Sequence, residues 1–312
     1  KHLWQTALPS PLRNWHYKTF GPKLLWTQWR LPLQLYLEKL GGQVPDIFFS
    51  PGHYGPLCSP VPTVITIMDL AYLYFPDDFR KKDLRQLSSW TKRSVIQGKH
   101  IFAISHSTKA DIIKAYNIKP ESITVTYPGL TLKVVKREGD NSFKHMQVYQ
   151  NITQPYLIYV GTLQPRKNIV RLLEAFRQMK SQFPDIKLVL VGKKGWLYEE
   201  IFTKVKTLQL EAEVIFTGYV SDYEKYELIR HAHALLLPSL YEGFGLPVLE
   251  AMALEVPVVI SKVSSLSEVG GDAAIYIEDP KSIDSIAKSL WEVLQLSQNK
   301  RLSLIAKGKD QV

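Results

Sequence analysis

The sequence of 312 residues predicts two open α/β domains, each built on a parallel β-sheet wrapped by helices. Short apolar runs, which are typical of buried strands, alternate with longer amphipathic stretches along the chain. This alternation stops once, across residues 129–154, where the chain becomes polar, and then starts again. A chain of this length can bury two separate cores, so we expect a cleft between two domains.

We place the N-terminal domain at residues 1–135, a linker at 136–154 and the C-terminal domain at 155–312. The apolar runs of the N-terminal domain predict strands at 46–50, 63–67, 101–105 and 123–127, with helices at 82–97 and 108–116. Those of the C-terminal domain predict strands at 156–160, 187–191, 213–217, 234–238 and 256–260, with helices at 169–181, 223–231 and 247–254.

Composition indicates an ordinary soluble protein, because 45% of the residues are hydrophobic and 22% are charged. Its apolar runs all fall well short of the ~18 residues that a membrane helix needs. The first residues lack a signal-peptide pattern. A single cysteine, Cys58, cannot form an internal disulfide, which favours a reducing compartment. We therefore expect a cytoplasmic location.

The net charge of +10 is unevenly placed along the chain. Residues 1–150 hold 20 basic and 10 acidic side chains, and the remainder is balanced. The excess predicts an anionic partner for the first half, such as a membrane surface, a lipid phosphate or nucleic acid. A solvated basic face is the alternative. Nucleic acid is disfavoured, because the chain lacks a strand motif that interleaves aromatic and basic residues.

Ligands of open α/β sheets bind beyond the carboxyl ends of the strands. After the predicted strand at 234–238 comes the stretch YEGFGLPVLEAM (241–252). Gly243 and Gly245 allow close backbone approach, and Pro247 suits the first turn of a helix. Free N–H groups at such a helix start bind anions. The stretch therefore predicts a phosphate site.

Two glutamates, Glu242 and Glu250, surround this anion site. Carboxylates repel phosphate but accept hydrogen bonds from neighbouring hydroxyls. Glu250 could hold the diol of a ribose and Glu242 the hydroxyls of a second group, which together describe a sugar nucleotide. The alternatives are a capping role for Glu250 and a solvated loop charge for Glu242.

Three further strand ends carry groups that suit the same ligand. Arg166 and Lys167 could neutralise a diphosphate, although a basic pair at a solvated helix start has the same pattern. Gly161 and Thr162 are the first two residues of the loop that holds this basic pair. The loops after the next two predicted strands add four further candidate ligand-binding residues: Gly192, Lys193, Tyr219 and Val220.

The segments VGTLQPRKNIVRLLEAF, LVLVGKKGW, IFTGYVSDYEKYELIRHA and LPSLYEGFGLPVLEAMALEVPVVISKVSSLSEVGGDAA resemble the nucleotide-binding half of the family-4 (group 1) retaining glycosyltransferases. The resemblance runs nearly continuously from about residue 156 to residue 279 and includes the family's Glu-x7-Glu pattern at Glu242 and Glu250. It implies the GT-B fold, in which two Rossmann-like domains face each other across a cleft.

The resemblance also implies residue roles. Glu250 would hold the ribose hydroxyls, Glu242 the hydroxyls of the donor sugar, and Arg166 and Lys167 the diphosphate. N–H groups of Phe244, Gly245 and Leu246 would line that diphosphate. We expect Glu242, Arg166 and Lys167 to be the catalytic residues, and we expect no metal or cofactor because the chain lacks an Asp-x-Asp motif.

The first half resembles the family more loosely, through residues 61–79 and 101–118. Many relatives have a histidine immediately before Asp69 that reaches the donor, and here Met68 takes its place. His53 and His106 are candidates to supply the lost contact, although each histidine could be structural. Asp69 could reach the cleft or cap a helix. The chain also lacks the family's opening strand with its glycine-rich loop and its final crossing helix, so we expect the N-terminal domain to be incomplete.

The sequence therefore predicts a retaining glycosyltransferase that moves a hexose, of the mannose or glucose type, from a UDP- or GDP-sugar to a saccharide or a lipid-diphosphate-linked saccharide. We expect peripheral binding to the inner face of the cell membrane. Two alternatives stay open: a GT-B hydrolase or epimerase of sugar nucleotides, and a non-catalytic basic binding protein with a degenerate pocket. Donor base, donor sugar, acceptor, linkage and oligomeric state are not specified by the sequence.

Overall fold

The computed structural model describes residue 18, residues 26–131, residue 152 and residues 155–312. Two parallel sheets are present, so the predicted α/β class is confirmed. The predicted linker at 136–154 lies outside the described residues except for Ile152, and the domain limits stay a prediction. Below, "N-terminal domain" means the described residues up to 131, and "C-terminal domain" means residues 155–312.

The N-terminal domain holds a sheet of four parallel strands in sequential order. Its strands are β1 (Phe48–Ser50), β2 (Thr63–Ile67), β3 (His100–Ala103) and β4 (Ile123–Val125). Its helices are α1 (Leu31–Leu40), which follows a π-helical turn at Trp26–Arg30, α2 (Ala71–Tyr74), α3 (Lys81–Gln97) and α4 (His106–Tyr116). A small core forms between this sheet and α2, α3 and α4, with Ile65, Ile67 and Ile112 at its centre.

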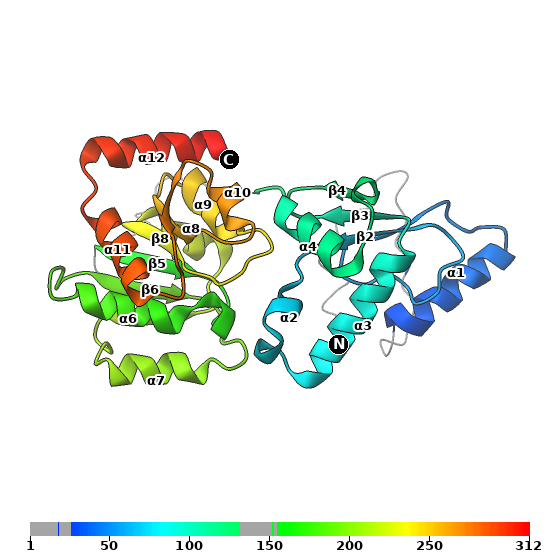
Figure 1. The fold of residues 1–312 in the computed structure, drawn as a ribbon, viewed down its shortest axis with the longest axis horizontal. Coiled ribbons are helices and arrows are strands. Elements are labelled where there is room, and N and C mark those ends of the chain that lie inside the picture. Colours follow the sequence, from blue (N-terminus) through cyan, green and yellow to red (C-terminus); the bar gives the residue numbers. More distant parts are fainter. Residues whose placement is uncertain (1–17, 19–25, 132–151, 153–154) are drawn as a thin grey trace.

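The C-terminal domain has six parallel strands in the order β10-β9-β8-β5-β6-β7. These are β5 (Tyr156–Val160), β6 (Lys187–Val191), β7 (Val214–Gly218), β8 (Ala234–Leu237), β9 (Val258–Ser261) and β10 (Ala274–Ile277). The helices are α6 (Ile169–Met179), α7 (Glu199–Thr207), α8 (Asp222–Arg230), α9 (Leu246–Ala253), α10 (Leu266–Gly270), α11 (Ile283–Leu294) and α12 (Gln298–Gln311). Helix α6 packs with α7 and α11, and α9 packs with α8, α10 and α12, so both faces of the sheet are covered (Figure 1).

The strand order reverses between β5 and β8, which are neighbours without being consecutive. At such a switch point the loops after the two strands run to opposite faces of the sheet and leave a crevice where ligands bind. The segments concerned are residues 161–168 after β5 and residues 238–245 after β8. In Figure 1, α2 and α4 of the N-terminal domain lie next to this side of the C-terminal domain.

The predicted strands at 63–67, 156–160 and 187–191 have the observed bounds, and every other predicted end lies within two residues of the observed one. Helix α7, which buries Ile201 and Val205, was not predicted. Helix α1 and the elements from α10 onward were also not predicted. None of the helices in the described part of the chain is long and apolar enough to cross a membrane.

Candidate active site

The loops after β5 and β8 place one buried carboxylate between two cations. Glu242 is 7% exposed and accepts a hydrogen bond of 2.5 Å from Lys167 Nζ. Arg166 Nη1 lies 3.6 Å from the other carboxylate oxygen, Oε2, and Ser239 Oγ donates at 2.7 Å to Oε1, the oxygen that Lys167 binds. Burial acts to raise the pKa of Glu242, but the charges of Lys167 and Arg166 outweigh burial and hold the pKa below its usual value. The three predicted catalytic residues are thus in direct contact, with Glu242 ionised at neutral pH.

Hydrogen bonds between the two loops hold this cluster together. Arg166 and Lys167 lie in a short 3₁₀ turn that ends at Asn168, whose backbone is left-handed with φ of 61°. The Asn168 amide donates to Pro238 O at 3.0 Å, and Leu240 N donates to Arg166 O at 2.9 Å. Asparagine tolerates the left-handed region better than most residues, which explains its place at the start of α6.

Arg166 contacts both domains. It is buried, and its Nη1 donates to Tyr241 O at 2.5 Å within the C-terminal domain. Its backbone N–H donates to the carboxylate of Asp78 in the N-terminal domain. Burial raises the pKa of Asp78, while the Arg166 charge opposes that rise. Arg166 therefore connects the predicted diphosphate site to the facing domain.

The predicted helix start after the glycines is confirmed at α9, one residue earlier than expected. Gly245 precedes it with φ of +114°, a conformation that disfavours any residue with a Cβ. Pro247 has no N–H and Val248 N donates to Gly245 O at 2.9 Å, so the N–H groups of Gly245 and Leu246 are the candidates for an anion site here. Gly243 has a different neighbour from the one expected: a Cβ there would lie 2.3 Å from Met68 O, so the N-terminal domain occupies the space predicted for a ligand.

Gly161 and Gly192 are explained mainly by contact with each other. A Cβ on Gly192 would lie 2.0 Å from Gly161 O, and Gly161 N donates to Val191 O at 2.9 Å. The glycines therefore allow the loops after β5 and β6 to pack closely. Thr162, which follows, is exposed, and its carbonyl accepts a hydrogen bond from Tyr159 Oη.

Glu250, the second glutamate of the pattern, is paired with a lysine that the sequence did not single out. Lys225 Nζ on α8 donates to Glu250 Oε1 at 2.6 Å and lies 4.5 Å from the ring centroid of Tyr226. Burial lowers the pKa of Lys225, but Glu250 outweighs burial and the net shift is upward. Glu250 is 8% exposed, so the predicted ribose acceptor is already held by a buried ion pair.

The outer loops bring two predicted residues together. Lys193 Nζ lies 4.5 Å from the ring centroid of Tyr219, and that ring is 72% exposed. Val220 is buried, so only its backbone remains for a ligand. Phe244 is buried against Tyr127 of the N-terminal domain, with ring centroids 5.5 Å apart, and Leu246 is partly exposed.

In the N-terminal domain, His53 and Asp69 lie close enough to interact electrostatically. Burial lowers the pKa of His53, and the Asp69 charge opposes this shift. The Nδ1 atom of His53 is buried and has no hydrogen-bond partner among the described residues. Asp69 Oδ1 accepts from Ala71 N at 2.9 Å, which is the capping role left open by the sequence. The His106 ring packs against Tyr127, and its backbone N–H donates to Glu268 at 3.0 Å.

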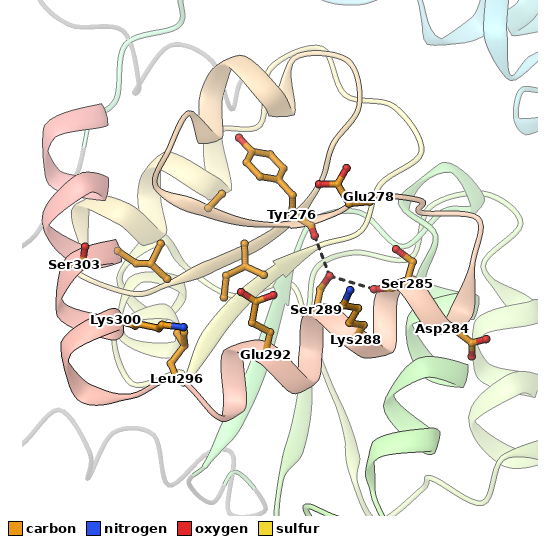
Figure 2. Close-up of a pocket in the computed structure, with 13 residues that line it drawn as sticks. Tyr276, Glu278, Asp284, Ser285, Lys288, Ser289, Glu292, Leu296, Lys300 and Ser303 are labelled. Carbon is orange, nitrogen blue, oxygen red and sulfur yellow. Dashed lines mark hydrogen bonds between the residues drawn. The ribbon is translucent and has the colours of Figure 1, made fainter.

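A cavity of about 820 Å³ lies away from these residues, between β10, α11 and α12 (Figure 2). Ser289 Oγ at its edge donates to the carbonyls of Tyr276 and Ser285. Charged side chains of both signs line it, including Lys288, Glu292 and Lys300. None of the candidate site residues predicted from the sequence lines this cavity.

Solved structures share this fold. WaaG, a glycosyltransferase involved in lipopolysaccharide biosynthesis, aligns with a TM-score of 0.71 and 20% identity, covering 89% of this chain and 76% of that chain. Anabaena Alr3699/HepE, solved in complex with UDP and glucose, aligns with a TM-score of 0.70 and 19% identity, covering 94% of this chain and 78% of that chain. The fold is therefore GT-B, as the resemblance implied.

The family model for glycosyl transferases group 1 matches residues 141–311, which is more than half of the chain. The protein belongs to this family. It is 33% identical to the O-antigen chain mannosyltransferase B of Escherichia coli over 74% of its length, and 32% identical to the O-antigen chain mannosyltransferase RfbU of Salmonella typhimurium over 73%. The chain spans 61% of the length of each of these relatives.

Proposed function

We propose that this protein transfers a hexose from a nucleoside-diphosphate sugar to a saccharide acceptor. The observation that carries the proposal is the buried cluster of Glu242, Lys167 and Arg166 at the switch point of the C-terminal sheet. Relatives named as mannosyltransferases favour mannose as the hexose, and the HepE complexes support a nucleoside diphosphate as the carrier.

The cluster suits the charge changes of glycosyl transfer. The bond from the anomeric carbon to the diphosphate breaks, and a bond from that carbon to the acceptor oxygen forms. Arg166 and Lys167 stabilise the leaving diphosphate, which takes the acceptor's proton, while Glu242 accepts hydroxyls of the sugar. As the resemblance implies, attack is on the same face and the anomeric configuration is retained.

Donor binding requires the existing ion pairs to rearrange. Lys167 Nζ is bound to Glu242 at 2.5 Å and Lys225 Nζ to Glu250 at 2.6 Å. A diphosphate would draw Lys167 away from Glu242 and free that carboxylate for the sugar, and ribose hydroxyls would share Glu250 with Lys225. The cluster of Glu242, Arg166 and Lys167 carries one excess positive charge before binding, which suits an anionic diphosphate.

We propose that no divalent metal is needed, because Arg166 and Lys167 supply the positive charge that a metal would supply at the diphosphate. Turnover of GDP-mannose or UDP-glucose should be unchanged by excess EDTA and by added Mg²⁺ or Mn²⁺. A loss of activity in EDTA that Mg²⁺ restores would overturn this part of the proposal.

The test of the proposed function compares UDP and GDP as ligands and UDP-glucose and GDP-mannose as donors. We expect one nucleoside diphosphate to raise the melting temperature and the corresponding sugar nucleotide to be consumed only when a saccharide acceptor is present. Consumption without acceptor would indicate the hydrolase or epimerase instead. Failure of both ligands to bind would favour a non-catalytic protein.

We further propose that the acceptor is a lipid-diphosphate-linked saccharide at the cytoplasmic face of a membrane, which the N-terminal domain contacts. Helix α1 and the turn before it expose large apolar side chains, with Trp29 70% exposed and Leu40 85% exposed. The entire net charge of +10 lies within residues 1–150. Exposed apolar groups with an excess of basic charge are typical of contact with anionic lipid.

Co-sedimentation with vesicles tests this contact. The protein should bind vesicles that contain phosphatidylglycerol, should bind phosphatidylcholine vesicles less, and should be released by salt. The double variant Trp29→Ser/Leu40→Ser should lose binding, and Trp291→Ser, which changes an exposed tryptophan of the C-terminal domain, should keep it. Equal binding by both variants would contradict the proposed contact.

A further inference from the structure

Tyr241 belongs to the C-terminal domain, but its side chain packs in the N-terminal domain. Its ring stacks on Tyr74 of α2, with centroids 5.4 Å apart and planes 26° apart. Its hydroxyl donates to Asp111 Oδ2 on α4 at 2.5 Å and accepts from Leu70 N at 3.4 Å. The side chain is 7% exposed, so the contact is part of a packed interface.

Asp111 is shared by two phenols. Its Oδ1 accepts from Tyr74 Oη and its Oδ2 from Tyr241 Oη, each at 2.5 Å. Burial raises the pKa of Tyr241, and the hydrogen bond to the Asp111 carboxylate raises it further. Tyr241 therefore stays protonated and serves as a donor to Asp111.

The backbone of Tyr241 leads directly into the predicted diphosphate site. Its carbonyl accepts from Arg166 Nη1 at 2.5 Å. The next residue is Glu242, whose N–H donates to Ser264 Oγ at 2.9 Å. Tyr241 thus places its side chain in the N-terminal domain, while its backbone carbonyl binds Arg166. It also directly precedes Glu242 in the chain.

We propose that Tyr241 is a positioning residue that couples contact between the domains to the geometry of Arg166 and Glu242. The inference deepens the proposed function and rests on it, because it names a residue that acts through the diphosphate site. With Tyr241 seated between α2 and α4, segment 240–243 is fixed from both domains. With the side chain released, the carbonyl that holds Arg166 moves with the segment.

A second contact between the domains provides the comparison. Glu268 on α10 accepts hydrogen bonds from His106 N at 3.0 Å, Ser107 N at 3.1 Å and Tyr127 Oη at 3.3 Å. This carboxylate caps the start of α4, as a charge complements a helix N-terminus. None of these three donors belongs to the cluster of Arg166, Lys167 and Glu242. Glu268→Gln therefore loosens the interface without altering the coupling proposed for Tyr241.

Three variants separate coupling from general loss of structure. Tyr241→Phe removes the hydroxyl and keeps the ring on Tyr74. Glu268→Gln weakens the other contact between the domains. Tyr156→Phe makes the same chemical change at a buried tyrosine whose hydroxyl donates to Leu228 O at 2.7 Å inside the C-terminal domain.

Hydrogen exchange of the peptide 239–246, measured without ligand, tests the positioning itself. We expect Tyr241→Phe to speed exchange by about tenfold, because a hydrogen bond to a charged group is lost. Tyr156→Phe and Glu268→Gln should leave this peptide within about twofold of wild type. Unchanged exchange in Tyr241→Phe, or equal acceleration in all three variants, would overturn the proposal.

Calorimetric titration with UDP and GDP tests the consequence for the site. Tyr241→Phe should raise the Kd of the nucleoside diphosphate that wild type binds by about tenfold, and Asp111→Asn should do the same. The double variant should be no weaker than Asp111→Asn alone, because Asp111→Asn already disturbs the hydrogen bond that Tyr241→Phe removes. Additive losses would overturn the coupling. If wild type binds neither nucleotide, the proposed function fails, while the exchange measurement still decides the role of Tyr241.

Discussion

The two glutamates of the Glu-x7-Glu pattern are both buried and both paired with lysine, yet their surroundings differ. Glu242 and its cations are built by two loops of the C-terminal domain and are contacted by the N-terminal domain through Asp78 at Arg166 and Met68 at Gly243. Glu250 is paired with Lys225 between α8 and α9, within one domain. The catalytic end of the predicted donor site is thus contacted by the N-terminal domain at Arg166 and Gly243, whereas the Glu250–Lys225 pair lies within the C-terminal domain and has a neighbouring contact from Tyr226 Oη to Thr131 O at 3.4 Å.

This difference means that nucleoside binding and turnover depend on different parts of the site. Helices α8 and α9 pack together in the C-terminal domain and hold Lys225 against Glu250. Contact with the N-terminal domain instead shapes the surroundings of Arg166 and Glu242, where charge would develop in the proposed transfer. Substitution of Glu250 should therefore affect nucleoside binding, whereas substitutions that disturb Arg166 should affect both diphosphate binding and turnover.

Glu242→Gln should have the largest effect. The amide keeps the shape but leaves Lys167 and Arg166 buried beside a neutral group, so the free energy of unfolding should fall by about 3 kcal/mol. Turnover of the donor should fall by at least about 100-fold. Urea unfolding and a transfer assay check both. Lys167→Met/Glu242→Leu is the control, since it should recover stability without recovering activity; full activity in Glu242→Gln would refute the role.

Glu250→Ala should come next, with an effect on binding more than on stability. Loss of the acceptor for two ribose hydroxyls should raise the Kd of UDP or GDP by about 100-fold. Calorimetric titration measures it. Glu278→Ala removes an exposed glutamate that is paired with Lys262, and it should leave the Kd unchanged. A normal Kd in Glu250→Ala would place the ribose elsewhere.

Glu268→Gln should cost about 1 kcal/mol of unfolding free energy, because the charged cap on the first N–H groups of α4 becomes a neutral one. The affinity for nucleoside diphosphate should stay within about twofold of wild type, since Glu250 and its surroundings are unaffected. Urea unfolding with parallel titration tests this. A large loss of affinity would show that the nucleoside end also depends on domain contact.

His53→Gln should have the smallest effect, and only in acid. Burial lowers the pKa of His53 in the folded protein, so below the ordinary pKa of about 6.5 the unfolded chain binds a proton that the folded chain does not. Stability therefore falls as pH falls, by at most about 1.4 kcal/mol per pH unit from this group. Urea midpoints at pH 7.5, 6 and 5 should fall less steeply in His53→Gln than in wild type. Parallel curves would contradict the assignment.

The contact of Glu242 with Arg166 and Lys167 could be predicted because all three follow strands that end at the same edge of a parallel sheet. Lys225 could not, since it lies inside helix α8 and reaches Glu250 only through the packing of α8 on α9. Tyr241 stands beside Glu242 in the motif, but its contacts with Tyr74 and Asp111 come from the other domain. Sequence spacing carries no signal for contacts made across a domain interface.

The loop glycines show the same limit of prediction from sequence. Gly192 and Gly243 have the residue type that a ligand-binding loop needs, yet their nearest neighbours are Gly161 O and Met68 O. A pattern can indicate that a backbone is approached closely without showing what approaches it.

The approach of Met68 O to Gly243 also offers a way to hold the two domains apart. A methyl group at position 243 would lie 2.3 Å from that oxygen and 2.9 Å from Asp69 Cβ, closer than atoms can pack. The methyl group of alanine at this position would clash with Met68 and Asp69 and would push the two domains apart. Gly243→Ala would then hold the protein open by steric exclusion, with every charged group of the donor site retained, and small-angle scattering would register it as a larger radius of gyration.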